Sequence, residues 1–230
     1  MKSKEQDSFE EKFGYKATPV RVAVDALAVF INKDNPIKGL SLKQVDAIFA
    51  KNRRRGNPEE IATWGQVGLT GDWVNRPISL YGRNSASGTY GFFKKVAMKK
   101  GDYKNSVKEQ PGSASVVQSV SVDRFGIGYS GIGYKTASVR ALPLSESGTN
   151  YMEASAENAL AGEYPLARFL YIYVNKAPGK PLDPMTQEFL RMVLSKEGQQ
   201  IVVKDGYFPL ASSVIQEDLG KIINVSSLTN

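Results

Sequence analysis

Two apolar segments that lie far apart in the chain constrain the fold more than any other feature. Residues 20–31 are almost continuously apolar, interrupted by Arg21 and Asp25, and residues 167–174 form a second such run. Apolar runs of this kind are typical of buried strands. We interpret them as paired crossings between two lobes, and a chain of 230 residues that is 41% hydrophobic can build the core of each.

Between and beyond these runs, predicted helices alternate with predicted strands. Ser41 is a suitable N-cap for the helix that follows it, and Gly14 is a suitable C-cap for the first helix. The alternation indicates an α/β protein with mostly parallel sheets. Strands are predicted at 20–31, 77–81, within 126–144 and at 167–174, and helices around 9–13 and at 42–50, 90–100, 113–122, 153–160, 183–194, 197–204 and 213–223.

The composition excludes several kinds of catalytic and metal site. The chain contains no His and no Cys, so Ser-His-Asp and Cys-His nucleophile pairs, zinc sites and disulfides are all excluded. A Ser-Lys hydrolase would need an S-x-x-K spacing, which the sequence lacks. We therefore expect no enzyme, no metal and no cofactor.

The formal net charge of +7 favours an anionic partner. Its densest stretch, residues 51–55, contains Arg53, Arg54 and Arg55 and is followed by a Gly-Asn-Pro turn. No aromatic residues interleave this run as they would on a base-stacking surface. We interpret it as a solvated turn and predict no nucleic-acid partner.

Neither a membrane span nor a secretory leader is evident. No apolar run reaches the roughly 18 residues that a spanning helix needs, so we predict no membrane insertion. The first seven residues, Met-Lys-Ser-Lys-Glu-Gln-Asp, are polar, whereas a signal peptide would continue into an apolar stretch. We therefore expect no signal peptide in this chain, so that either the protein is cytoplasmic or these residues are not its natural start.

The junction at residues 83–89 is the most informative stretch. A strand is followed by Gly82-Arg83-Asn84-Ser85-Ala86-Ser87-Gly88-Thr89 and then by a helix. The first turn of a helix has free N–H groups and a positive dipole end, and Gly88 would let an oxyanion approach the backbone. Ser87 and Thr89 add hydroxyl donors, and Arg83 adds a planar fork for two oxygens. This composition predicts a small-anion cradle.

A simple helix cap explains the same stretch equally well when it is considered alone. Ser87 or Thr89 would then cap the helix while Arg83 pairs with a surface carboxylate. The other apparent motif, G-x-G-x-x-G at residues 126–131, is a weaker signal. It follows a helix-like segment and leads into strand-like residues, whereas the glycines of a dinucleotide site follow a strand and lead into a helix.

Taken together, segments along nearly all of the chain resemble one family. The chain is similar to the phosphate-binding solute receptors of bacterial phosphate ABC transporters, which have a type II periplasmic-binding-protein fold. The segments that carry this resemblance are 22–30 with Asn35-Pro36, 42–49, 83–89, 125–129, 194–199 and 206–210.

The resemblance implies the roles of the residues in the loop. The family pattern R-x-D-x-S-G-T places Arg83 as a guanidinium clamp and Ser87, Gly88 and Thr89 as hydroxyl and backbone donors. Ser85 stands where the family has Asp. A carboxylate there accepts the proton of hydrogen phosphate and repels sulfate, whereas Ser85 can donate as well as accept. The resemblance therefore leaves the preference for phosphate over sulfate open.

The resemblance also implies a division into lobes. We expect lobe I to comprise residues 1–24 and 172–230, and lobe II to comprise residues 25–171 with the Arg83–Thr89 anion loop. The resemblance begins after the opening strand and anion loop of the family, so we expect the first lobe to be incomplete. Because donors from that part would not contribute, we expect a reduced affinity for phosphate.

The leading hypothesis is a non-catalytic periplasmic or extracytoplasmic receptor that binds phosphate between its lobes and delivers it to an inner-membrane ABC permease. Two alternatives stay open. Ser85 makes a receptor for another oxyanion, such as sulfate, molybdate or tungstate, plausible. An interaction or scaffold protein would reuse the fold without transport and self-associate through the incomplete first lobe.

Overall fold

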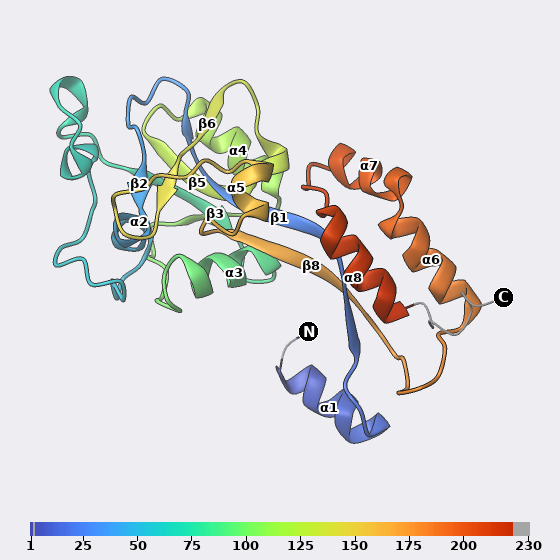
Figure 1. Cartoon of the computed structure of the whole chain (residues 1–230). Coiled ribbons are helices and arrows are strands. Elements are labelled where there is room, and N and C mark those ends of the chain that lie inside the picture. The colour runs from blue at the N-terminus through green and yellow to red at the C-terminus, as the bar shows by residue number, and fades with distance from the viewer. Residues whose placement is uncertain (2, 223–230) are drawn as a thin grey trace. The chain divides into compact units, whose positions relative to one another are not determined.

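A computed structural model describes residue 1 and residues 3–222. The chain divides into two compact units, one formed by residues 1–24 with the residues from 169 onward and the other by Asp25–Arg168. They are called unit 1 and unit 2. The second boundary falls between Arg168 and Phe169, slightly before the predicted position after residue 171. The assignment of these units to the lobes of a receptor remains a prediction. Figure 1 shows the elements of both.

The main sheet combines parallel and antiparallel pairs. It comprises β1 (Thr18–Asn32), β3 (Ser79–Arg83), β4 (Lys108–Gln110), β5 (Gly126–Gly131) and β6 (Val139–Ala141), in the order β4-β3-β5-β1-β6, and β8 (Ala167–Val174) pairs with β1. Strand β3 runs parallel to β4 and β5. A small second sheet pairs β2 (Leu40–Ser41) with β7 (Leu144–Ser145), also in parallel. The predicted α/β class is confirmed. The long strand β1 is the exception to parallel pairing, because it runs antiparallel to β5 and β6.

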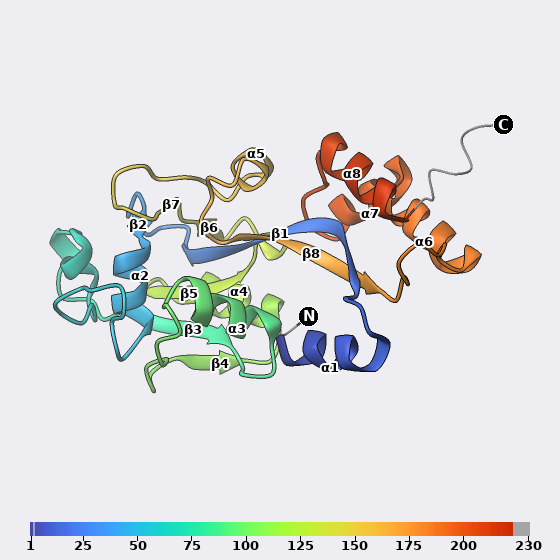
Figure 2. The same ribbon diagram turned by 60° about the horizontal axis from the view of Figure 1, so that its bottom comes forward.

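Helices in unit 2 begin where local caps predict. Helix α2 (Leu42–Phe49) follows a capping box in which Ser41 and Gln44 satisfy each other's backbone N–H groups, and it ends because Ala50 is extended. Helix α4 (Ser113–Val122) buries Val116, Val117 and Val120 against β1 and β3. Figure 2 shows α4 beside the sheet. The remaining helices are α3 (Gly88–Val96), α5 (Ala156–Leu160) and short 3₁₀ turns at Trp64–Val67, Gly71–Trp73 and Ile132–Tyr134.

Helix α3 differs from its predicted range of 90–100. It starts at Gly88 because Ser87 caps it, and its last turn gives way to a turn in which Lys99 and Lys100 have φ of 45° and 62°. Left-handed backbone of this kind ends a helix. The N-terminal turn of α3 therefore includes Gly88 and Thr89.

The basic run is a structural feature and only partly a solvated turn. The side chain of Arg55 is nearly buried and its guanidinium donates to the carbonyls of Val96 and Ala97, both at 2.7 Å. It also pairs with Glu146 at 2.6 Å. Arg55 thereby satisfies carbonyls at the C-terminal end of α3, where a cation is favourable. The prediction of a solvated turn is therefore wrong for Arg55.

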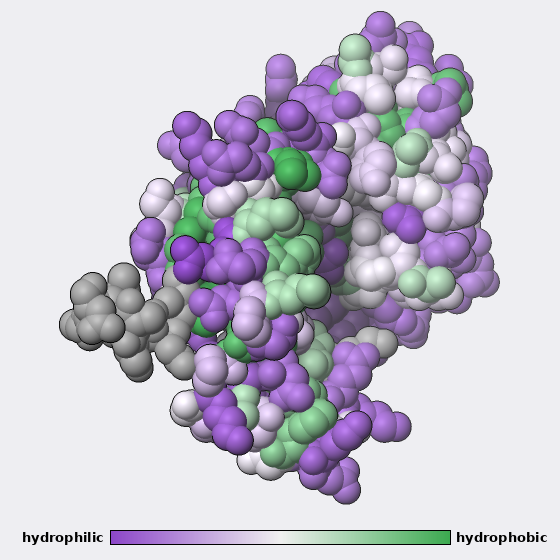
Figure 3. Space-filling model, turned by 90° about the vertical axis from the view of Figure 1, so that its right-hand side faces the viewer, coloured by the Kyte–Doolittle hydropathy of each residue, from purple (hydrophilic) through white to green (hydrophobic). Residues whose placement is uncertain are grey.

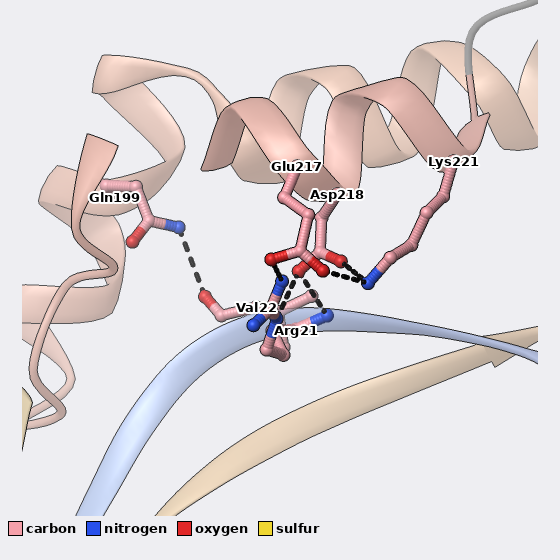
Figure 4. A network of polar contacts seen from close by, with 6 residues as sticks. All are labelled: Arg21, Val22, Gln199, Glu217, Asp218 and Lys221. Atoms are coloured by element: carbon pink, nitrogen blue, oxygen red, sulfur yellow. Dashed lines mark hydrogen bonds and ion pairs between the residues drawn. The ribbon is translucent and has the colours of Figure 1, made fainter. Parts of the chain in front are cut away.

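Unit 1 contains α1 (Ser3–Phe13), the first part of β1, most of β8, and helices α6 (Pro184–Leu194), α7 (Lys196–Lys204) and α8 (Ser212–Ile222). Polar contacts tie α7 and α8 to β1, as Figure 4 shows. Arg21 donates from its backbone N–H and its Nε to the carboxylate of Asp218 at 3.1 and 2.7 Å. Gln199 donates to the carbonyls of Val22 and Val193. The helix predicted at 213–223 is confirmed up to residue 222, and residue 223 lies outside the described residues.

Apolar side chains remain exposed on the helices of unit 1. Met185, Phe189 and Met192 on α6 are 83%, 49% and 54% exposed, and their spacing places them on one face. Figure 3, turned by 90° from the view of Figure 1, shows hydrophobic patches among hydrophilic surface. None of the helices within the described residues is long and apolar enough to cross a membrane.

Candidate anion-binding site

The candidate site is the turn between β3 and α3 in unit 2. Strand β3 ends at Arg83, and the N–H of Ser87 donates to the carbonyl of Asn84 at 3.1 Å, which closes a tight turn. The N–H of Asn84 donates to the carbonyl of Gln110 at 3.2 Å, so the turn is also tied to the end of β4. These bonds bring Arg83 and the N-terminus of α3 together.

Ser87 is the N-cap of α3. It has extended φ and ψ angles of −82° and 134°, and its Oγ accepts from the N–H of Thr89 at 3.1 Å. The part of the cap interpretation that makes Ser87 the cap is therefore correct. It does not exclude an anion cradle, because the hydroxyl of Ser87 keeps its own proton to donate. The helix dipole adds positive potential at this point.

Arg83 is half-buried beside the cap, and its guanidinium makes a specific contact. Its Nη1 donates to the Oγ of Ser113 at 2.7 Å. Its Nε is buried and has no hydrogen-bond partner among the described residues. Leaving a buried donor unsatisfied costs about 1–3 kcal/mol, and more for a charged group. Arg83 also makes no ion pair with a carboxylate among the residues that the structure describes, contrary to the cap interpretation, and its Nε remains available for an anion.

The other predicted site residues lie on the outer side of the turn. Ser85 and Gly88 are exposed, and Thr89 is half-buried. A Cβ added to Gly88 would meet no atom within 4 Å, so packing of the protein does not require glycine there. A small residue at an open helix N-terminus allows close approach to the backbone. Their part in binding remains a prediction.

Aromatic side chains contact the turn and the helix α3 that follows it. Tyr129 on β5 stacks on Phe93 of α3 with ring centroids 3.9 Å apart, and its hydroxyl donates to the carbonyl of Arg83 at 3.4 Å. The hydroxyl of Tyr103 donates to the carbonyl of Tyr90 at 3.0 Å. Burial raises the pKa of both hydroxyls, so they stay protonated donors. A Cβ at Gly82 would lie 2.8 Å from the Tyr129 ring, so glycine is needed for this packing.

These supporting residues were not predicted from the sequence. Tyr129 belongs to the stretch 125–129 that carries the resemblance, yet no contact with the loop was predicted for it. Ser113 was predicted only as the start of a helix. Residues 126–131, which match G-x-G-x-x-G, form strand β5 and lead into no long helix. That geometry is not that of a dinucleotide-binding turn.

A family model described as a PBP superfamily domain matches residues 1–197, most of the chain. The chain belongs to the PBP superfamily. One curated relative is the phosphate-binding protein PstS of Pseudomonas aeruginosa, which is 59% identical over 223 residues, covering 96% of this chain and 69% of the relative. Another is the protein SphX of Synechococcus elongatus, which is 28% identical over 214 residues, covering 91% of this chain and 60% of the relative.

Two solved structures share the fold of this chain. A possible phosphate-binding protein from Planctomyces limnophilus matches with a TM-score of 0.73 and 27% identity, covering 97% of this chain and 78% of that one. A putative phosphate ABC transporter substrate-binding protein from Clostridium perfringens, with bound phosphate, matches with a TM-score of 0.69 and 25% identity, covering 92% of this chain and 76% of that one. The type II periplasmic-binding-protein fold implied by the resemblance is confirmed.

Proposed function

We propose that this chain is a non-catalytic receptor that binds inorganic phosphate through the loop from Arg83 to Thr89. The observation that carries the proposal is the half-buried guanidinium of Arg83, whose buried Nε has no partner among the described residues, beside the capped N-terminus of α3. A planar cation and helix N–H groups together suit a tetrahedral oxyanion. The relatives named as phosphate-binding proteins support phosphate as that anion.

The wider role follows from the same relatives. We propose that the receptor acts outside the cytoplasmic membrane and delivers phosphate to an ABC permease. The substrate-binding protein of a phosphate ABC transporter from Clostridium perfringens supports this role. Titration calorimetry of the purified chain with phosphate is the direct test. We expect a saturable heat with one site per chain, and the absence of binding at millimolar phosphate would contradict the proposal.

Ser85 decides how well phosphate is distinguished from other oxyanions. Its side chain is exposed at the turn, where it can donate to a fully ionised oxyanion as well as accept a proton. We expect sulfate to compete with phosphate in the natural sequence and to compete less in Ser85→Asp, because the new carboxylate repels sulfate and accepts from hydrogen phosphate.

Competition calorimetry of both proteins measures this selectivity. Ser147→Asp is the matched control, because it introduces the same charge at an exposed serine of another turn in unit 2. If Ser85→Asp leaves the ratio of sulfate to phosphate affinity unchanged, Ser85 does not set the selectivity. If only sulfate, molybdate or tungstate binds, the alternative of another oxyanion receptor replaces phosphate.

Self-association through unit 1 is a separate proposal. The exposed face formed by Met185, Phe189 and Met192 on α6 supports it, because large exposed apolar patches commonly mark interaction surfaces. We expect a concentration-dependent dimer by size-exclusion chromatography with light scattering, and a monomer for Met185→Glu combined with Met192→Glu. A monomer of the unaltered chain at all concentrations would contradict the proposal and leave phosphate binding unaffected.

A further inference from the structure

Ser113 makes a partly buried contact with the guanidinium of Arg83 in the anion loop, although it lies 30 residues further along the chain. It is the first residue of α4 and is only 9% exposed. Its Oγ accepts from Nη1 of Arg83 at 2.7 Å, a short hydrogen bond from a charged donor. Hydrogen bonds from a guanidinium are stronger than those between neutral groups. The contact therefore fixes one side of the Arg83 guanidinium.

The position of Ser113 is itself fixed by its surroundings. Its backbone carbonyl accepts from the Oγ of Ser130, a buried residue on β5, at 3.2 Å. The N-cap residue of α4 is Gly112, which makes no side-chain hydrogen bond. The hydroxyl of Ser113, the next residue, makes the side-chain hydrogen bond at this end of the helix. Helix α4 packs its valines against the core of unit 2. These contacts anchor the backbone that carries the Ser113 hydroxyl.

The shape of the guanidinium determines which N–H donors of Arg83 remain available to a ligand after the contact with Ser113. The planar group has two edges that can bind two oxygens at once, the Nη1–Nη2 edge and the Nε–Nη2 edge. Ser113 accepts from one of the two N–H groups of Nη1. The remaining edge contains Nε, the buried atom that has no partner among the described residues. The hydrogen bond to Ser113 therefore takes a donor of Nη1 and none of the donors of the Nε–Nη2 edge.

We propose that Ser113 is a positioning residue that orders Arg83 before the anion arrives and presents its Nε–Nη2 edge. The proposal rests on the proposed function of the Arg83 loop. A long side chain that is ordered in advance loses less conformational freedom on binding, which increases affinity. Removal of the hydroxyl in Ser113→Ala should weaken phosphate binding by about tenfold, while Ser113→Thr, which keeps the hydroxyl, should stay close to the unaltered chain.

The mobility of the guanidinium gives a readout that does not depend on phosphate. Nitrogen-15 relaxation of the Arg83 Nε–Hε group in the ligand-free chain reports its motion on the picosecond-to-nanosecond timescale. We expect a rigid group in the unaltered chain and in Ser113→Thr, and a more mobile one in Ser113→Ala. Ser119→Ala removes a hydroxyl from the same helix and is the matched control. Unchanged circular dichroism verifies that each variant is folded.

The outcomes separate the possible roles. An equally rigid Arg83 in Ser113→Ala overturns the proposal. A loss of phosphate affinity without a change in Arg83 mobility would mean that Ser113 contacts the anion directly. Increased Arg83 mobility without a loss of affinity would mean that the ordering of Arg83 has no part in binding. Each of these two results also overturns the proposal. If the unaltered chain binds no phosphate, the proposed function fails, while the relaxation measurements still decide whether Ser113 orders Arg83.

Discussion

Replacement of Arg83 by alanine is expected to lower phosphate affinity by about two to four orders of magnitude. A bidentate arginine contributes two charge-assisted hydrogen bonds, and each is worth about 1.5–3 kcal/mol. Their loss of about 3–6 kcal/mol corresponds to that range of affinity, since each 1.4 kcal/mol is about tenfold. Titration calorimetry at fixed ionic strength measures the change.

Two further variants distinguish a specific contact from a general effect of charge. Arg124→Ala removes the same charge from an exposed arginine of unit 2 that lies over the ring of Trp73. We expect this control to keep the affinity within a small factor. Arg83→Lys keeps the charge but loses the planar fork, so it should lie between alanine and the natural residue. Equal affinities for Arg83→Ala and Arg124→Ala would refute the role assigned to Arg83.

Replacement of Arg21 by alanine is expected to destabilise unit 1 by about 3–5 kcal/mol, because the buried Asp218 carboxylate loses the charged hydrogen bond from the Arg21 side chain. The side chain of Asp218 has no exposed surface, whereas that of Lys221, its other cation, is 33% exposed. Figure 4 shows the three charged side chains together with Glu217. Urea unfolding followed by far-UV circular dichroism measures the loss. Tryptophan fluorescence follows unit 2, which contains both tryptophans of the chain.

An exposed ion pair and a double substitution are the controls. Arg191→Ala breaks an exposed pair with Glu188, and such pairs contribute about 0–1 kcal/mol. Arg21→Met with Asp218→Leu removes both charges and should recover most of the stability, because neither group is then buried without its partner. A loss for Arg21→Ala no larger than that for Arg191→Ala would contradict the prediction.

The same network gives the stability a defined dependence on pH. Burial disfavours the charged form of Asp218, but hydrogen bonds from Arg21 and Lys221 outweigh it and hold the pKa of Asp218 below its usual value. A lowered folded-state pKa means that the stabilisation is present above the unfolded pKa of about 3.9 and is lost as the pH falls through the folded-state pKa. The stability difference between the unaltered chain and Asp218→Asn should therefore shrink at acidic pH.

Local patterns in the sequence were sufficient for most helices. Helix α4 has the predicted bounds, and Ser41 caps α2 as predicted, because both depend on residues within one or two turns of each other. Strand β4 was not predicted, since its three residues are polar and show no apolar alternation. The antiparallel pairing of β1 could not be inferred either, because pairing depends on contacts between distant segments.

The residues of the anion loop were predicted from the sequence, but the residues of other elements that contact the loop were not. Arg83, Ser87 and Thr89 lie within seven residues, so a local motif was enough to bring them together. The partner of the guanidinium, Ser113, comes from another helix, and the hydroxyl beneath the loop, Tyr129, comes from another strand. Neither has a sequence signal of its own, because a serine that starts a helix and a tyrosine in a strand are both common for purely structural reasons.

The division of the chain has a consequence for its synthesis. Residues 25–168 of unit 2 are continuous, whereas unit 1 combines the first 24 residues with the segment that begins at Phe169. During translation, domains fold in the order in which they emerge. The anion loop and the residues of unit 2 that contact it can therefore reach their native contacts on the ribosome before Arg21 has bound Asp218. Asp218 belongs to α8, which is the last helix to emerge among the described residues.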